Sequence, residues 1–250
     1  MIEAINLTKR YEDGNLALDH LDLQVSAGEI YCLLGANGAG KTTTINLMLN
    51  FIEPTEGTVR INGIDMTRDP LRAKKYVAYL SENVMLYGDF TALQNLAFFS
   101  RLGGRDDLGR TDLRRILLQV GLPPEALERR VKDFSKGMRQ KLGIAIAVAK
   151  DAPALLFDEP MSGLDPKAAA ELVQTLEELR AQGKAILMST HDIFRTKELA
   201  DRVGIMKDGR KVAELSRDAL QRIDLERLYL EHMRAAGEIA EKEIAPLRAV

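Results

Sequence analysis

The chain has 250 residues, of which 46% are hydrophobic and 29% are charged, and it carries 35 Lys and Arg against 37 Asp and Glu. This composition is typical of a globular protein with one large domain or two small ones, and the balanced charge gives no broad basic field for nucleic acid. The single cysteine, Cys32, excludes an intramolecular disulfide and a cysteine-cluster metal site. The apolar runs are too short to cross a bilayer and the first residues lack a signal-peptide pattern, so we expect the chain to fold in the cytosol.

Apolar and β-branched runs bounded by Gly, Asp or Pro predict several short strands. These runs lie near residues 2–7, 21–25, 30–34, 58–61, 77–80, 154–157, 185–189, 203–206 and 211–215. Helical patterns follow Lys41, Asp165 and His191, and this alternation predicts an α/β fold with a largely parallel sheet. Between residues 91 and 150 the strand signal fades, and we expect a helical subdomain there.

The segment from Asp218 onward has a different pattern. Leu225, Leu228, Tyr229 and His232 recur at helical spacing and predict a short amphipathic helix. We expect this face to dock against the protein's own body rather than a membrane. Residues 235–250 are small and charged, and we expect them to fray.

The stretch LLGANGAGKTTTINLML, residues 33–49, follows a predicted strand and opens a predicted helix. Gly35, Gly40, Lys41 and Thr42 fit the spacing G-x-x-x-x-G-K-S/T. Glycines let successive N–H groups point into one concavity, and the dipole of the following helix adds positive potential. Lys41 can then reach terminal phosphates, and the Thr42 hydroxyl can bind Mg²⁺. The alternative is a glycine-rich turn that binds nothing.

The stretch ALLFDEP, residues 154–160, is a buried-strand pattern that ends in two carboxylates. In a phosphate-loop fold, Asp158 suits the support of Mg²⁺, and Glu159 could orient or deprotonate a water that attacks the γ-phosphate. The chain lacks the N-K-x-D run with which a GTPase reads guanine, and nothing indicates the acceptor pocket of a small-molecule kinase.

The stretch FSKGMRQK, residues 134–141, places a serine and a glycine at a predicted helix start, where they form a second anion site. One chain does not need two sites for one γ-phosphate. Two chains that face each other head to tail would, because each would close the other's nucleotide.

Over nearly its whole length the sequence resembles the nucleotide-binding subunits of ABC transporters. The phosphate loop, FSKGM, LLFDEP, SGLD (residues 162–165) and STHD (residues 189–192) occur in the family's order. The resemblance implies a P-loop ATPase domain over residues 1–216 and a C-terminal helical extension over 217–250. The domain would have a mainly parallel central sheet, an N-terminal antiparallel β part and a helical subdomain inserted at about 85–150. It also implies an enzyme that hydrolyses ATP with Mg²⁺ and powers transport by closing a head-to-tail dimer.

The resemblance further implies roles for individual residues. Glu159 would poise the attacking water and His191 would contact the γ-phosphate, while Thr42, Asp158 and Glu82 would meet the metal. Nucleotide binding would involve Tyr11, stacked on adenine, with Asn37, Gly38, Ala39, Gly40, Lys41, Thr42, Thr43, Ser135, Lys136, Gly137 and Asp165. Of these, Ser135 and Gly137 would act from the opposite subunit.

Two departures from the commoner family pattern resemble the exporter branch, in which the ATPase pairs with a separately encoded permease. Lys136 and Met138 stand where glycine and glutamine are usual, and Glu82 stands where many members have a glutamine. The stretch LERLYLEHM near the end is similar to that branch's terminal helix.

We therefore expect three properties of the assembly. The first is an integral membrane permease docked near residues 82–99, where Met85, Leu86, Tyr87 and Phe90 either contact the permease or pack within the helical subdomain. The second is a homodimer, or a pair with a related ATPase subunit, without nucleic acid. The third is a place at the cytoplasmic face of the membrane, held there by the permease. The alternative is a soluble ABC ATPase that serves a cytosolic assembly machine.

Overall fold

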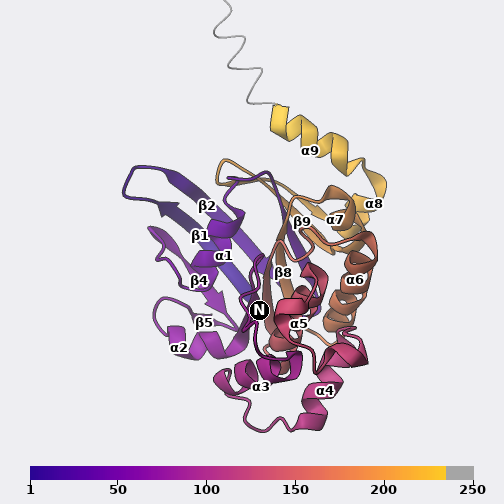
Figure 1. Ribbon diagram of the computed structural model, residues 1–250. Helices are drawn as coiled ribbons and strands as arrows, with labels where there is room; N and C mark the ends of the chain where they lie inside the picture. The colour runs from indigo at the N-terminus through magenta and orange to yellow at the C-terminus, as the bar shows by residue number, and fades with distance from the viewer. Residues whose placement is uncertain (235–250) are drawn as a thin grey trace, which may run out of the picture.

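Two β-sheets form the framework of the computed structural model, which describes residues 1–234 (Figure 1). The smaller sheet is antiparallel, with the order β2-β1-β4-β5. Its strands are β1 (Ile2–Arg10), β2 (Leu16–Val25), β4 (Glu56–Ile61) and β5 (Ile64–Asp65). The larger sheet has the order β10-β9-β3-β8-β7-β6 and is parallel except for β10. Its strands are β3 (Ile30–Leu34), β6 (Val77–Leu80), β7 (Ala154–Asp158), β8 (Ala185–Thr190), β9 (Arg202–Lys207) and β10 (Arg210–Ser216).

The α/β fold with a mainly parallel sheet and an antiparallel β part is therefore confirmed, and each predicted strand is present. β1 and β2 are longer than predicted. Register shifts between the two strands break the apolar alternation, so the sequence pattern ends before the strands do. Asn6 and His20 have left-handed φ angles of 48° and 50°, so the alternation of inward and outward residues does not continue through them. The two-residue β5 was too short for the sequence pattern to indicate.

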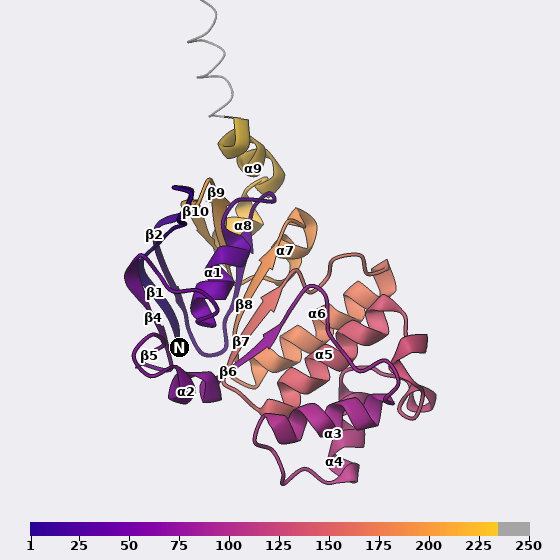
Figure 2. The same cartoon turned by 60° about the vertical axis from the view of Figure 1, so that its left-hand side comes forward.

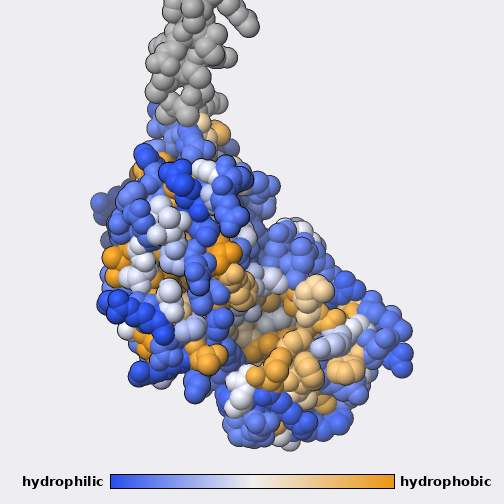
Figure 3. Space-filling model, turned by 90° about the vertical axis from the view of Figure 1, so that its left-hand side faces the viewer, coloured by the Kyte–Doolittle hydropathy of each residue, from blue (hydrophilic) through white to orange (hydrophobic). Residues whose placement is uncertain are grey.

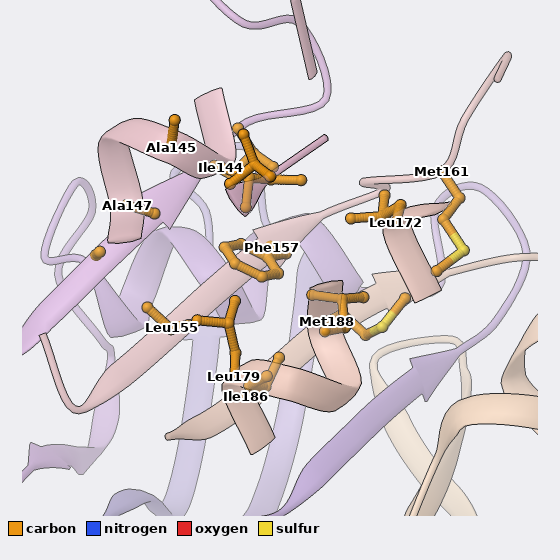
Figure 4. Packing of buried hydrophobic residues seen from close by; sticks show 14 of the residues in the cluster. Ile144, Ala145, Ala147, Leu155, Phe157, Met161, Leu172, Leu179, Ile186 and Met188 are labelled. Atoms are coloured by element: carbon orange, nitrogen blue, oxygen red, sulfur yellow. The ribbon is translucent and has the colours of Figure 1, made fainter. Parts of the chain in front are cut away.

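Two hydrophobic clusters cover opposite faces of the larger sheet. Successive residues of a strand point to opposite faces, so Leu155 and Phe157 join one cluster while Ala154 and Leu156 join the other. Helix α1 (Lys41–Met48) lies between the two sheets (Figure 2). On the other face, Phe157 packs among side chains of α5 (Lys136–Lys150) and α6 (Pro166–Ala181) (Figure 4).

Between residues 91 and 150 the chain is mainly helical and projects to one side of the sheets (Figure 2). Helices α3 (Ala92–Leu102) and α4 (Arg110–Gln119) precede α5 there. Thr91 begins α3 with a capping box, and the Ser135 hydroxyl accepts a hydrogen bond from the Met138 N–H at the start of α5. The remaining helices are α2 (Pro70–Ala73), α7 (Ile193–Leu199), α8 (Arg217–Arg222) and α9 (Leu225–Arg234).

Helix α9 packs against the body of the protein, as predicted. Leu225 is buried, and Leu228 and Tyr229 are partly buried against the same hydrophobic cluster as α5. Lys207 donates hydrogen bonds of 2.8 and 3.1 Å to the carbonyl oxygens of His232 and Met233, in the last turn of α9. None of the helices in residues 1–234 has the length and apolarity needed to cross a membrane. The expectation for residues 235–250 lies outside the described residues.

Glu214 fixes β10 to its surroundings through several donors. It accepts hydrogen bonds from Lys211, Arg202 and the Tyr31 hydroxyl, the last at 3.0 Å. Burial opposes ionisation of Glu214, but these three donors outweigh it and lower the pKa to about 2. Burial also raises the pKa of Tyr31, so its hydroxyl remains a donor.

Candidate functional site

The sheet order brings three chemical motifs to one edge. β3, β8 and β7 are neighbours and parallel, so the loops that follow them leave the sheet side by side. The phosphate loop follows β3, His191 follows β8, and β7 ends at Asp158 with Glu159 next. Residues far apart in the sequence therefore meet at the carboxyl ends of the central strands.

The phosphate loop needs glycine at specific positions. Gly40 has φ 100°, and a Cβ there would lie 2.8 Å from the Ala17 carbonyl oxygen. A Cβ on Gly35 would lie 2.7 Å from the carbonyl oxygen of Met206. Both contacts are with backbone, which cannot yield as a flexible side chain can, so only glycine allows this close approach.

Lys41 places its ammonium group inside the loop. Its Nζ donates to the carbonyl oxygens of Gly35 at 2.7 Å and Ala36 at 3.1 Å, and the residue is only 6% exposed. The Glu159 carboxylate lies 3.5 Å from the same nitrogen. The loop therefore holds a desolvated cation whose partners are mostly neutral carbonyls.

Asp158 and Glu159 are held by the neighbouring strand. The Thr42 hydroxyl lies 3.5 Å from Oδ1 of Asp158, and the Ser189 hydroxyl donates to that same oxygen. Glu159 has a left-handed φ of 48° and donates its N–H to the Ser189 carbonyl and hydroxyl oxygens at 3.2 and 3.0 Å. A non-glycine residue in that conformation is strained and needs such support.

The Glu159 carboxylate joins two further groups. Its Oε2 lies 3.0 Å from Nδ1 of His191, an imidazole that is 59% exposed. Glu82 lies on the same side of the loop, and its Oε1 accepts a hydrogen bond of 3.2 Å from the Ser162 hydroxyl. The charged groups predicted from the sequence thus converge, with Glu159 between Lys41 and His191.

A cavity of about 550 Å³ lies over the phosphate loop, within the size range of small-molecule and cofactor sites. It is lined by Tyr11, Asn15, Leu16, Ala17, Ala36, Asn37, Gly38, Gly40, Lys41, Thr42, Thr43, Glu82, Glu159, Asp208 and Gly209. Tyr11 stands at its rim, and Lys9 Nζ lies 5.3 Å from the centre of the Tyr11 ring. Ala39 is buried within the loop and accepts the Gly209 N–H at 3.2 Å.

Sequence reasoning missed part of this lining. Residues 15–17 and the Asp208–Gly209 turn carry no motif, and they meet because the Asp19 N–H bonds to the Gly209 carbonyl oxygen at 2.9 Å. Asp-Gly between two strands could have indicated a hairpin there, but not its place beside the phosphate loop. Ser189, outside the cavity lining, is the first residue of the STHD stretch, but the sequence gives it no role.

Seven predicted residues do not line the cavity: Ala39, Asp158 and His191 lie next to lining residues, whereas Ser135, Lys136, Gly137 and Asp165 are separate from it. Ser135, Lys136 and Gly137 lie at the start of α5, and Asp165 caps α6 by accepting the Ala168 N–H at 2.9 Å. Ser135, Lys136 and Asp165 are exposed. Within one chain, therefore, the phosphate loop and the second predicted anion site are separate.

This phosphate-loop site defines a nucleotide-binding protein, and comparison with known proteins identifies the family. Residues 18–162 match the ABC transporter family. The bacitracin transport ATP-binding protein BcrA of Enterococcus faecalis is 35% identical over 97% of this chain and 77% of that protein. The Nod factor export ATP-binding protein I of Burkholderia orbicola (strain AU 1054) is 36% identical over 88% of this chain and 72% of that protein.

Solved structures agree with the sequence comparison. The dimeric post-hydrolysis structure of the ATP-binding cassette MJ0796, bound to ADP and Pi, aligns with a TM-score of 0.79 and 27% identity. It covers 87% of this chain and 99% of that chain. The chain belongs to the ABC transporter family. It is an ATP-binding subunit of an ABC transporter and an ATPase.

Proposed function

We propose that this chain binds ATP with Mg²⁺ in the cavity over the phosphate loop and hydrolyses it to drive an exporter. The observation that carries this proposal is the convergence of Lys41, Thr42, Asp158 and Glu159 at one edge of the sheet. Bound phosphate oxygens would replace the Gly35 and Ala36 carbonyls as partners of the Lys41 ammonium group. Because those carbonyls are neutral, the exchange to charged oxygens is favourable.

The donor set beside the phosphate loop fits Mg²⁺. The Thr42 hydroxyl and the Asp158 carboxylate lie 3.5 Å apart, and such oxygen ligands are the kind that Mg²⁺ prefers. Glu82 would add a third oxygen donor from the cavity wall. The metal would neutralise charge on the phosphates.

Glu159 is the proposed general base. Its carboxylate would accept the proton of the attacking water, and His191, 3.0 Å away, would orient it and contact the γ-phosphate. Tyr11, at the rim of the cavity, would stack on the adenine ring, and Asn37, Gly38, Ala39 and Thr43 would complete the phosphate loop.

A head-to-tail dimer would complete each site. Ser135, Lys136 and Gly137 would close over the nucleotide of the opposite subunit, and Asp165 would link the two sites. The exposure of Ser135, Lys136 and Asp165, and the separation of all four residues from the chain's own cavity, support this arrangement. The dimeric relative bound to ADP and Pi supports it as well.

The proposed partner at the membrane is a permease. It would dock on the helical region (residues 91–150) and the loop that precedes it, and would hold the chain at the cytoplasmic face. Met85 is 83% exposed, and Tyr87, Phe90 and Phe98 are also exposed. The rings of Tyr87 and Phe98 lie 5.1 Å apart. Figure 3 shows apolar surface on the helical lobe beside a hollow between it and the rest of the molecule.

One predicted contact of that surface needs correction. Leu86 is half-buried and packs against the main hydrophobic cluster, because its side chain points inward from the loop that precedes α3. The proposed contacts are therefore Met85, Tyr87, Phe90 and Phe98.

Export as the direction of transport is supported by the Nod factor export relative, while the name of the bacitracin relative states transport alone. Export would be tested with the parent chain, with Glu159 intact, and its permease in inside-out membrane vesicles. ATP-driven cargo uptake into these vesicles would support it, and ATP-driven cargo loss would contradict it.

The proposed docking is tested with tagged Glu159→Gln chains purified from membranes of the native cell with ATP and Mg²⁺ present. We expect a multi-helix permease to co-purify, and we expect Met85→Glu to release it while ATP binding stays unchanged. Ile5→Glu, at an exposed apolar position on the antiparallel sheet, is the matched control and should retain the permease. Capture of soluble proteins alone would contradict the proposal and favour the assembly-machine alternative.

A further inference from the structure

Ser189 lies among the candidate site residues at the carboxyl ends of the central strands, but the proposed function gives it no role. It lies near the end of β8, the strand between β3 and β7, and it is fully buried. The parallel register pairs Ser189 with Asp158 on one side and with Leu33 on the other. Paired residues on adjacent strands point to the same face, so the Ser189 side chain must lie beside the Asp158 carboxylate.

The Ser189 hydroxyl uses its donor and its acceptor on two consecutive residues. Its proton goes to Oδ1 of Asp158, and its oxygen accepts the Glu159 N–H at 3.0 Å. A hydroxyl has one proton to donate. This relay of two hydrogen bonds therefore runs from the Glu159 N–H through the Ser189 hydroxyl to the Asp158 carboxylate. The relay ends on the carboxylate that the Thr42 hydroxyl approaches at 3.5 Å.

The two ends of the relay need different kinds of support. A buried carboxylate keeps one orientation only if donors fix it, and Asp158 is 7% exposed. Glu159 must keep a left-handed φ of 48° for its carboxylate to lie between Lys41 and His191. One small side chain in the neighbouring strand meets both needs.

We propose that Ser189 is a positioning residue for ATP hydrolysis, whose hydroxyl fixes the Asp158 carboxylate and the Glu159 backbone relative to the phosphate loop. This inference rests on the proposed roles of Asp158 and Glu159. Ser189 would act through these two residues, because it is fully buried and its hydroxyl is hydrogen-bonded to both of them.

The test is Ser189→Ala in the full-length chain, which removes the relay and leaves the strand and the Glu159 N–H bond to the Ser189 carbonyl in place. We expect kcat to fall by about ten- to a hundred-fold, the size of a lost positioning contact. ATP affinity measured by calorimetry in EDTA should stay within about two-fold, because Lys41 and the loop N–H groups are unchanged. Mn²⁺ binding to the chain with a non-hydrolysable ATP analogue, followed by electron paramagnetic resonance, should weaken.

Ser100→Ala is the matched control. Ser100 is 3% exposed on α3, and its hydroxyl has no hydrogen-bond partner among residues 1–234. It makes the same buried substitution without touching the site, so all three measurements should match the parent chain. Ser189→Thr keeps the hydroxyl on a strand position that favours β-branched residues, and it should recover most of the lost kcat.

Two results would overturn the role of Ser189. One is a Ser189→Ala chain with parental kcat and Mn²⁺ binding. The other is a parallel loss of kcat, metal-free ATP affinity and melting temperature, which would indicate a structural role alone. Failure of the proposed function is distinguishable, because Glu159→Gln would then hydrolyse ATP as fast as the parent chain.

Discussion

Two glycines in similar hairpin turns, one of them beside the nucleotide cavity, provide a matched test of how much close backbone packing there contributes to stability. Asp208–Gly209 joins β9 to β10, and Asn62–Gly63 joins β4 to β5, each as a two-residue turn. Both glycines have φ 76°, and the residues before them have φ 47° and 52°. They differ in surroundings: a Cβ on Gly63 meets nothing within 4 Å, whereas one on Gly209 would lie 2.9 Å from the Ala17 carbonyl oxygen.

Alanine at either glycine incurs the strain of a left-handed φ, which costs about 1–2 kcal/mol. At Gly209 the Cβ also meets backbone atoms of Ala17 and Leu18 at 2.9–3.1 Å, and relief of such crowding costs about 1–3 kcal/mol more. We therefore expect Gly63→Ala to lower the free energy of unfolding by about 1–2 kcal/mol and Gly209→Ala to lower it by about 2–5 kcal/mol.

The assay is urea unfolding of both variants and the parent chain, followed by circular dichroism and extrapolated linearly to water. Gly209→Ala should also weaken ATP binding, because the Gly209 N–H bonds to the Ala39 carbonyl of the phosphate loop and the turn must shift. Gly63→Ala should leave ATP binding unchanged. Equal losses of stability in the two variants, or parental ATP affinity in Gly209→Ala, would refute this reasoning.

Two further predictions concern the neighbouring strands β9 and β10 of the larger sheet. Glu214→Gln should lower the free energy of unfolding by about 1–2 kcal/mol at pH 7, allowing for solvent screening. The Glu214 pKa is about 2 in the folded chain against 4.5 for the ordinary side chain, so its contribution is complete above pH 4.5 and is lost as the pH falls toward 2. Urea unfolding at several pH values should show the difference between variant and parent shrinking, and a constant difference would contradict the pKa assignment. Lys207→Met removes both hydrogen bonds to the last turn of α9. Amide hydrogen exchange in α9 should therefore accelerate, while exchange in α5 stays unchanged. Unchanged protection of α9 would contradict the idea that Lys207 anchors this helix.

Much of the fold could be predicted because its signals are local. β3, β7 and β8 are buried along their whole length, and each begins with a short continuous apolar run that the sequence pattern reveals. The phosphate loop is equally local, since the glycines, Lys41 and Thr42 form one continuous segment. Predicted strand ends failed where bulges at Asn6 and His20 broke the alternation.

The rest of the candidate site depends on contacts between distant segments. Ala17 and Gly209 meet at the cavity because the turn after β9 packs on β2, and no local pattern encodes that contact. The contact of Ser189 with Asp158 depends on the register of β7 against β8, which only the folded sheet defines. The inward turn of Leu86 likewise depends on how its loop packs against the helical region.

A complementation experiment tests the central claim, that each ATP site is made by two chains, most directly. Lys41→Ala inactivates the phosphate loop of one chain, and Ser135→Arg blocks the start of α5 in another, so each variant alone should hydrolyse almost no ATP. In an equal mixture, half of the dimers would contain one chain of each kind and hence one intact site, which predicts recovery of up to about a quarter of the parental rate. A mixture as inactive as the separate variants would contradict the account, because it would mean that Lys41 and Ser135 serve the same chain's nucleotide.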